Sequence, residues 1–267
     1  MKKTLLVCSP STRKYFMNID EYRIITDPLS ATEAEDLKDS EESVIAVGGG
    51  AVIDAAKIIC RNPVICYPTT ASGTSFTSHS VCWDEHKKIS INVPLPKAVI
   101  VREEFLQTLP NSVIRKTKYD AVSHCLDSMW SSKSTDRSTD MAEEALNMLL
   151  NYENLSTLIT AGNLAGRVIS IVPTTILHSL SYPLTGIYGI SHGEALGFLL
   201  ESVCEVMDSE VAKELNIPKL DVGMFSVSDV SEEALTYSKL QDTSKNFDLQ
   251  DVKQIYMDAI RRNTLKR

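Results

Sequence analysis

Short apolar runs that end in turn residues alternate with helical patterns over the first part of the chain. Leu5–Cys8, Tyr22–Thr26, Ser43–Val47 and Val64–Tyr67 each have the length and composition of a strand. Between the last two runs, apolar residues recur at helical spacing over Ala51–Cys60. Strand, tight turn, helix and strand in this order are typical of a parallel βαβ unit, so we expect an open α/β sheet here.

The hydrophobic pattern becomes helical after Pro110. Apolar residues at helical spacing cover residues 112–151, 161–180 and 193–207, and weaker helical patterns follow. Pro173 and Pro183 predict that the middle stretch is two helices or one kinked helix. We therefore expect an α/β domain over residues 1–110 and an all-α domain over residues 111–267.

Composition narrows the classes of protein to consider. The 267 residues include 27 Lys and Arg against 35 Asp and Glu, a net charge of −8 that argues against a general nucleic-acid binder. No apolar run approaches the ~18 residues of a membrane helix, and the N-terminal MKKTLLVCSP lacks the long apolar core of a signal peptide. Six scattered cysteines without a C-x-x-C pair are typical of reduced thiols. We expect a cytoplasmic protein with neither nucleic acid nor membrane as a partner.

Two polar turns follow consecutive predicted strands. In VIAVGGGAVIDAAK, three glycines precede a helix, and bare N–H groups at a helix N-terminus favour a phosphate. The spacing of the glycines matches neither G-x-G-x-x-G nor a P-loop, so the segment could be only a tight turn. Asp54 could be an acid that the helix dipole favours in the first turn, or it could contact a ligand. The second turn, YPTTASGTSFTS, is rich in hydroxyls. Because both turns end parallel strands, a shared phosphate site is favoured.

A second set of residues has the chemistry of a metal site. Asp120 and His124 are four residues apart and share a helix face, and His178 and His192 follow, fourteen positions apart. One carboxylate and three imidazoles suit Fe(II) or Zn(II), and an open position would take an alcohol or carbonyl oxygen. Each residue could instead be structural: a local hydrogen-bonded pair, a core histidine or a helix cap.

At these residues the chain resembles the iron-containing (group III) alcohol dehydrogenase family. The family's Gly-Gly-Gly-Ser-x-x-Asp-x-x-Lys turn is matched over residues 48–57 and its Pro-Thr-Thr loop over residues 68–70. Its ligand pattern, Asp-x-x-x-His followed by a His and a His-Gly, is matched in order, and Lys88 matches a lysine that approaches the nicotinamide-side phosphates. The runs DSMWSSKST and HSLSYPLTGIYGISHG look most like the branch with phosphonoacetaldehyde reductases.

The resemblance implies an α/β dinucleotide-binding domain with a parallel sheet, followed by an all-α metal-binding domain, the fold shared with dehydroquinate synthase. It implies reversible hydride transfer between NAD or NADP and a small alcohol, aldehyde or ketone. The aldehydes that it implies include phosphonates and other acidic aldehydes. It also implies a homodimer. The implied metal ligands are Asp120, His124, His178 and His192, with Tyr182 as a further catalytic residue. The implied cofactor contacts are Gly48, Gly49, Gly50, Asp54, Thr69, Thr70, Thr74 and Lys88.

Asp27, which ends the second predicted strand, could meet the adenine-ribose hydroxyls and favour NAD, or could simply form the turn before Pro28.

The chain also departs from the family pattern. Ala51 replaces the serine of the glycine turn, Phe76 stands about where a glutamate is usual, and Tyr182 occupies the place of a second histidine. The chain is also shorter than typical members. Two alternatives therefore stay open: a lyase or cyclase of the dehydroquinate-synthase type, and a cofactor-poor member that binds metal without catalysis.

Overall fold

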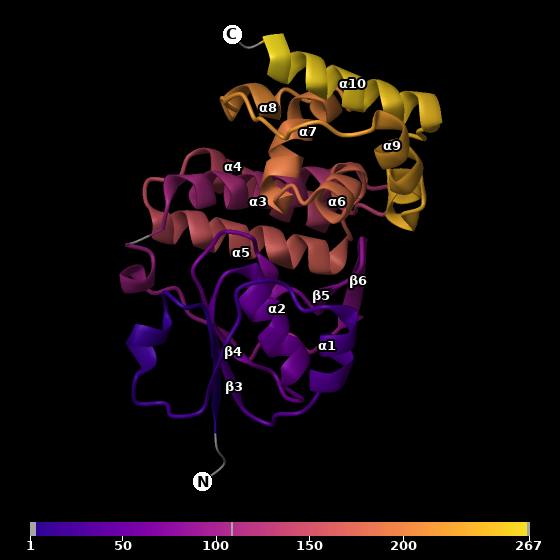
Figure 1. The fold of residues 1–267 in the computed structure, drawn as a ribbon. Coiled ribbons are helices and arrows are strands. Elements are labelled where there is room, and N and C mark those ends of the chain that lie inside the picture. The colour runs from indigo at the N-terminus through magenta and orange to yellow at the C-terminus, as the bar shows by residue number, and fades with distance from the viewer. Residues whose placement is uncertain (1–3, 108, 266–267) are drawn as a thin grey trace.

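The computed structural model describes residues 4–107 and 109–265, in which a sheet-containing N-terminal part is followed by stacked helices (Figure 1). The strands are β1 (Leu5–Cys8), β2 (Tyr22–Ile24), β3 (Val44–Gly48), β4 (Ile65–Pro68), β5 (His79–Asp84), β6 (Lys87–Asn92) and β7 (Ala98–Val99). The helices are α1 (Ala31–Leu37), α2 (Gly50–Ile59), α3 (Asn111–Met129), α4 (Asp136–Leu150), α5 (Leu155–Ile171), α6 (Ile176–Tyr188), α7 (His192–Val206), α8 (Val211–Glu214), α9 (Val227–Leu235) and α10 (Leu249–Leu265). The 3₁₀ turns are η1 (Arg13–Phe16), η2 (Thr74–Phe76), η3 (Glu103–Phe105) and η4 (Ser238–Asp242).

The N-terminal sheet is parallel, as the alternating pattern predicts. Its five strands lie in the order β2-β1-β3-β4-β7, and each adjacent pair is parallel. The four predicted strands and the predicted helix α2 all form, with ends within two residues of those expected. The predicted fold class, a parallel α/β sheet followed by helices, is therefore confirmed.

Alternate residues of the strands face two different cores. Val7, Ala46 and Cys66 point to the side covered by α2, where the apolar face of that helix packs. Leu6 and Val47 point to the other side and meet an aromatic group formed by η1, η3 and Tyr67 of β4. In that group Tyr15 and Phe105 lie 4.7 Å apart between ring centroids, and Phe16 and Tyr67 lie 5.6 Å apart. All six cysteines are free and buried, as expected for reduced thiols.

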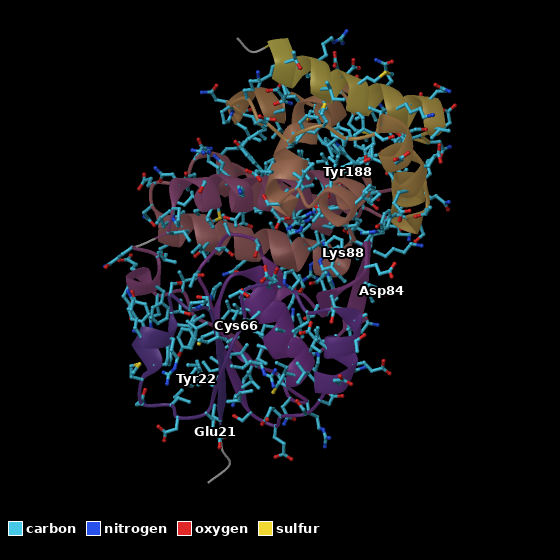
Figure 2. The ribbon with its side chains drawn as sticks, in the orientation of Figure 1. Glu21, Tyr22, Cys66, Asp84, Lys88 and Tyr188 are labelled. Atoms are coloured by element: carbon cyan, nitrogen blue, oxygen red, sulfur yellow. The ribbon has the colours of Figure 1, made fainter. Side chains whose placement is uncertain are left out.

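The hydrophobic pattern did not predict the antiparallel hairpin β5–β6 or the short helix α1. The turn of the hairpin runs through Glu85, which has a positive φ of 50° without being glycine or asparagine, so the usual sequence signal of a tight turn is absent. β6 extends from the N-terminal part toward the helices, and Lys88 lies near the junction in Figure 2.

In the helical part, α5 lies next to the sheet-containing part, α3 and α4 lie above it, and α10 lies farthest from the sheet (Figure 1). The middle stretch forms two helices, α5 and α6, separated around Pro173. Pro183 does not interrupt the structure but lies inside α6. Within the described residues no single helix is long and apolar enough to span a membrane, and α5 with α6 pass that test only as a pair bent by 104°.

Glycines let the helices approach the N-terminal part backbone to backbone. A Cβ added to Gly162 would lie 2.0 Å from the carbonyl oxygen of Ala71, and one added to Gly166 would lie 1.9 Å from that of Gly73. Both glycines lie on α5, one helical turn apart, so they form a smooth face against the loop after β4. On α6, a Cβ at Gly186 would lie 2.1 Å from the carbonyl oxygen of His86 in the β5–β6 turn.

We predict that Gly166→Ala lowers the free energy of unfolding by about 1–3 kcal/mol, because the added methyl group must push the backbone of Gly73 away. The melting temperature followed by circular dichroism should fall by several degrees. Thr160→Ala, on the exposed side of the same helix, is the matched control and should change stability by less than about 0.5 kcal/mol. Equal melting temperatures for the two variants would show that this contact is not tight.

Candidate active site

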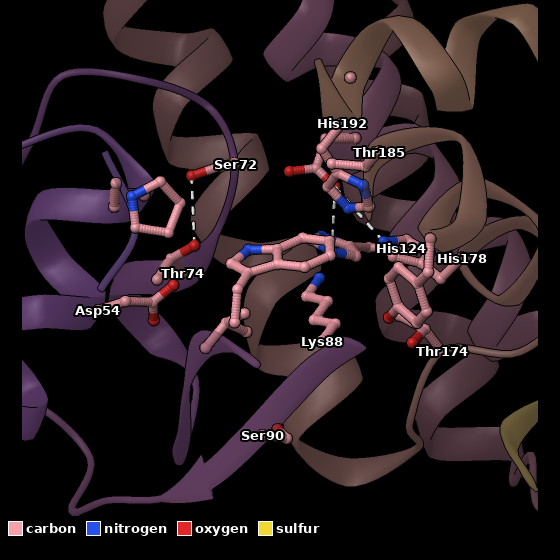
Figure 3. A pocket seen from close by; sticks show the side chains of 18 of the residues that line it. Asp54, Ser72, Thr74, Lys88, Ser90, His124, Thr174, His178, Thr185 and His192 are labelled. Carbon is pink, nitrogen blue, oxygen red and sulfur yellow. Dashed lines mark hydrogen bonds and ion pairs between the residues drawn. The ribbon is translucent and has the colours of Figure 1, made fainter. Parts of the chain in front are cut away.

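A cavity of about 730 Å³ lies where the N-terminal part meets the helices. The polar turns after β3 and β4 line one side of it, and α3, α6 and α7 line the other. In Figure 3, Asp54, Ser72 and Thr74 lie on the side of the sheet, while His124, His178 and His192 lie on the side of the helices. Carboxyl ends of parallel strands are the usual place for ligands in open α/β folds, which makes this cavity the candidate active site.

One carboxylate oxygen lies at the centre of the histidine group. The Oδ1 atom of Asp120 is 3.4 Å from His124 Nε2, 3.4 Å from His178 Nε2 and 3.7 Å from His192 Nε2. The rings of His124 and His178 stack with centroids 4.8 Å apart, and His178 and His192 meet edge to face at 5.3 Å. Three helices thus bring four residues, far apart in the sequence, to one point.

Close helix packing explains the position of His192. This residue begins α7, and Gly193 follows it at a place where a Cβ would lie 2.3 Å from the carbonyl oxygen of Lys116 on α3. One turn later, a Cβ at Gly197 would lie 2.5 Å from the ring of Tyr119. The His-Gly pair therefore combines a side chain directed at the cavity with the small residue that lets α7 reach α3.

A buried carboxylate orients His178. Asp127 on α3 is fully buried, and its Oδ2 accepts from the backbone N–H of His178 at 3.1 Å and lies 2.8 Å from the ring Nδ1. Its Oδ1 accepts from the backbone N–H of Leu177 at 2.9 Å. A carboxylate can only accept here, so the Nδ1 proton points to Asp127 and the Nε2 lone pair is left facing Asp120.

The electrostatics of the group disfavour the charged form of two of its imidazoles, those of His124 and His192. Burial lowers the pKa of His124 to about 3, although Asp120 opposes the shift, and burial also lowers the pKa of His192 well below its usual value. Burial raises the pKa of Asp120, but its interactions with the imidazoles, His124 first, outweigh this and hold that pKa below its usual range. At neutral pH Asp120 is therefore an anion and the imidazoles of His124 and His192 are neutral, which are the forms that bind metal ions.

These residues fit a metal ion. Asp120 Oδ1 and His178 Nε2 are buried and have no hydrogen-bond partner among the described residues. Ligand atoms about 2.1 Å from a tetrahedral ion stand about 3.4 Å apart, close to the separations found here. Asp120, His178 and His192 offer ligand atoms that all lie within 4.8 Å of one another. The donor set, oxygen and imidazole nitrogen, suits Fe(II) or Zn(II).

The two polar turns meet at the other side of the cavity. β3 and β4 are adjacent, and a Cβ at Gly50 would lie 3.3 Å from Thr74 Oγ1 and 3.4 Å from Ser72 Oγ. Of the residues considered for cofactor contact, five line the cavity: Asp27, Gly50, Asp54, Thr74 and Lys88. The others, Gly48, Gly49, Thr69 and Thr70, are not among the lining residues. Gly48 packs against Val52, and Thr69 donates its backbone N–H to the carbonyl of Gly48.

Two charged residues of the N-terminal part are desolvated at this cavity. Burial raises the pKa of Asp54 to about 6 against the opposing charges of Lys57 and Lys88. Burial lowers the pKa of Lys88, although Asp120 and Asp54 favour its charged form. Lys57 is different, because its ammonium donates to the carbonyls of Thr74 and His79 and to Thr77 Oγ1 and so has a structural role.

Tyr182 links the histidine group to the last part of the chain. Its ring stacks on His192 with centroids 5.8 Å apart, and Tyr237 meets it at 5.0 Å. Lys88 Nζ lies 4.5 Å from the centre of the same ring. Burial raises the pKa of Tyr182, so its hydroxyl stays protonated at neutral pH.

Comparison with known proteins identifies the family. The model described as the C-terminal part of the Fe-containing alcohol dehydrogenase family matches residues 114–252, and a second model for iron-containing alcohol dehydrogenase matches residues 20–110. The chain belongs to the iron-containing alcohol dehydrogenase family. The resemblance inferred from the two turns and the histidines is thereby confirmed.

Similar proteins agree with this assignment. A phosphonoacetaldehyde reductase from Streptomyces viridochromogenes is 28% identical over 200 residues, which cover 58% of this chain and 51% of that protein. A 1-propanol dehydrogenase from Citrobacter freundii is 28% identical, with 60% and 50% covered. An iron-containing alcohol dehydrogenase structure from Thermotoga maritima superposes with a TM-score of 0.81 at 26% identity, covering 96% of this chain and 91% of that one. The chain spans about half the length of the curated relatives it matches.

Sequence reasoning missed several residues of the cavity. Asp127 had a signal, since it lies seven residues after Asp120 and three after His124 and therefore shares their helix face. Trp83, Tyr237 and Lys239 also line the cavity but belong to no motif. They reach it only because the hairpin and η4 pack against the helices.

We predict that Asp127→Asn weakens metal binding about 10- to 100-fold, because His178 loses the carboxylate that fixes its proton and orientation. The dissociation constant can be measured by competition with a chromophoric chelator. Asp140→Asn, an exposed carboxylate on α4, is the control and should leave the constant unchanged. An Asp127→Asn protein that binds metal as tightly as the control would contradict this role.

We also predict a pH-dependent gain in stability for Asp54→Asn. The pKa of Asp54 in the folded protein, about 6, is above its ordinary value, so the folded form holds this proton more tightly and loses stability as pH rises through that range. Asparagine removes the loss. The melting temperature of the variant relative to the native protein should rise between about pH 4 and pH 7 and stay level above that, and a difference that does not change with pH would refute the assignment.

Proposed function

We propose that this protein is a metal-dependent, NAD(P)-linked oxidoreductase that interconverts a small alcohol with its aldehyde or ketone. The observation that supports this most directly is the convergence of three imidazole nitrogens on Asp120 Oδ1, across one cavity from the glycine turn. Family membership and the names of the relatives, a reductase and a dehydrogenase of small molecules, point the same way.

Asp120, His124, His178 and His192 would hold Fe(II) or Zn(II). Such an ion supplies a Lewis acid that polarises the substrate oxygen. The chain itself supplies the rest of the environment: Asp127 keeps His178 in the binding tautomer, and Trp83, Tyr182 and Tyr237 bring aromatic surface to the cavity that displaces water from the substrate. Tyr182, protonated at neutral pH, can donate a hydrogen bond to the substrate oxygen.

The cofactor would lie between the polar turns and the histidines. Gly50 and the hydroxyls of Ser72 and Thr74 form a cradle for phosphate at the N-terminus of α2. Asp27 also lines the cavity, after edge strand β2, and its carboxylate would favour NAD over NADP by meeting a ribose hydroxyl. When bound, the nicotinamide of NADH or NADPH would supply the hydride for reduction of a carbonyl group, and the oxidised cofactor would accept it in the reverse direction.

We further propose that residues 1–110 form the dinucleotide-binding domain and residues 111–267 the metal-binding domain of a cytoplasmic homodimer. The separate apolar cores of the sheet and of the helices support the division. Edge strand β2 supports the dimer, because Tyr22 and Ile24 expose 49% and 44% of their surface beside unpaired backbone groups.

The test is anaerobic loading with Fe(II) or Zn(II), followed by NADH and NADPH oxidation with small aldehydes. We expect turnover, and we expect His192→Ala to lower metal affinity strongly and to cut turnover by at least about 1,000-fold. His86→Gln, which changes a histidine outside the cavity, is the control.

The outcomes separate the alternatives. Metal binding without nucleotide binding would overturn the oxidoreductase proposal in favour of a cofactor-poor member. Retained metal and turnover in His192→Ala would overturn the ligand assignment alone.

A further inference from the structure

We propose that Lys116 and Glu194 are positioning residues that hold His192 in the metal-binding group. The inference rests on the ligand set of the proposed function and adds two residues to it. Lys116 lies on α3, one turn before Asp120, and Glu194 lies on α7, two residues after His192. Lys116 Nζ and Glu194 Oε1 are 3.0 Å apart, so the ion pair joins the two helices that carry these ligands.

His192 is the least buried of the three histidines. Its side chain exposes 25% of its surface, against 9% for His124 and 2% for His178. The carboxylate of Asp127 orients His178 at 2.8 Å, whereas the contact between His192 Nδ1 and Ser181 Oγ is 3.4 Å long. His192 is also the first residue of α7, and helix ends fray more easily than helix centres. Its position therefore depends on whatever holds the first turn of α7.

Glu194 closes that first turn. Ser191 is the N-cap of α7, and its hydroxyl donates to Glu194 Oε2 at 2.6 Å. The backbone N–H of Glu194 donates in return to the carbonyl oxygen of Ser191 at 2.8 Å. His192 lies between these two residues in the sequence, so both bonds restrict the backbone that carries its ring.

Lys116 connects the closed turn to α3. The two backbones are already close here, since a Cβ at Gly193 would lie 2.3 Å from the carbonyl oxygen of Lys116. This contact sets the distance between the helices, but a glycine has no side chain that could stop α7 from turning about its own axis. The ion pair between Lys116 and Glu194 lies beside the contact and opposes that rotation. It thereby fixes the direction of the His192 ring.

The ion pair should matter more for metal binding than for stability. Its two side chains are 33% and 37% exposed, and ion pairs with such exposure contribute little to the free energy of unfolding. A metal ligand is more sensitive, because a small rotation of its ring weakens the bond to the ion. A pair that only stabilised the fold would have the opposite effect, on melting temperature and not on the metal.

The test uses the protein loaded with Co(II), because the visible absorption of this ion reports the geometry of its ligands. The second measurement is the rate at which a chelator removes the ion. Lys116→Met and Glu194→Gln each remove the ion pair and should speed up release about threefold. Glu194→Ala also removes the acceptor of the Ser191 hydroxyl and should speed up release about tenfold.

All three variants should shift the Co(II) absorption bands. The melting temperature of the metal-free protein should change by less than about 2 °C in Lys116→Met and Glu194→Gln. The double variant of these two should release the ion no faster than either single variant, because both changes remove the same interaction.

Two further variants are controls. Lys116→Arg keeps the positive charge and should restore the native spectrum and release rate. Lys245→Met removes an ion pair of 2.7 Å with Asp208, just beyond the other end of α7, and should change neither quantity.

Each contrary result decides one point. A native spectrum and release rate in Lys116→Met and Glu194→Gln would overturn the positioning role and leave the proposed function standing. A lower melting temperature with an unchanged spectrum would assign the pair to the fold and also overturn that role. A protein that binds no Co(II), or a His192→Ala variant with the native spectrum, would instead overturn the ligand assignment of the proposed function, and this inference with it.

Discussion

The architecture depends on backbone-to-backbone contact between the helices and the sheet-containing part. Gly162 and Gly166 bring α5 against the loop after β4, and Gly186 brings α6 against the β5–β6 turn. Within the helical part, Gly193 allows α7 to approach α3 just as closely. Side chains at these positions would move the polar turns and the histidines relative to each other. The cavity therefore has its shape because several small residues let rigid elements pack at short range.

The second constraint is electrostatic. The cavity contains one carboxylate surrounded by imidazoles and, on its other side, a half-buried aspartate whose pKa is raised. Burying a charged or unpartnered polar group destabilises a folded protein, and this cavity holds several such groups side by side. Clusters of buried ionisable groups with shifted pKa values are typical of binding and catalytic sites, where a ligand supplies the missing partner.

Local patterns predicted the parts of the fold that depend on neighbouring residues. The β3–α2–β4 unit, the glycine turn and the Asp120–His124 pair are all encoded within short segments, and so their positions could be predicted from sequence. The hairpin could not, since Glu85 supplies its turn without a glycine or asparagine signal. Tyr237 and Lys239 reach the cavity only through tertiary packing of η4, which leaves no trace in a local pattern.

Asp127 has a consequence beyond orienting one ring. The same carboxylate accepts backbone N–H groups in the first turn of α6, so the folding of that turn and the geometry of His178 are one cooperative event. Thermodynamic linkage then requires that a ligand bound by His178 also protects the start of α6 from local unfolding. A ligand held by His178 and the first turn of α6 would therefore stabilise each other, although the turn itself need not touch that ligand.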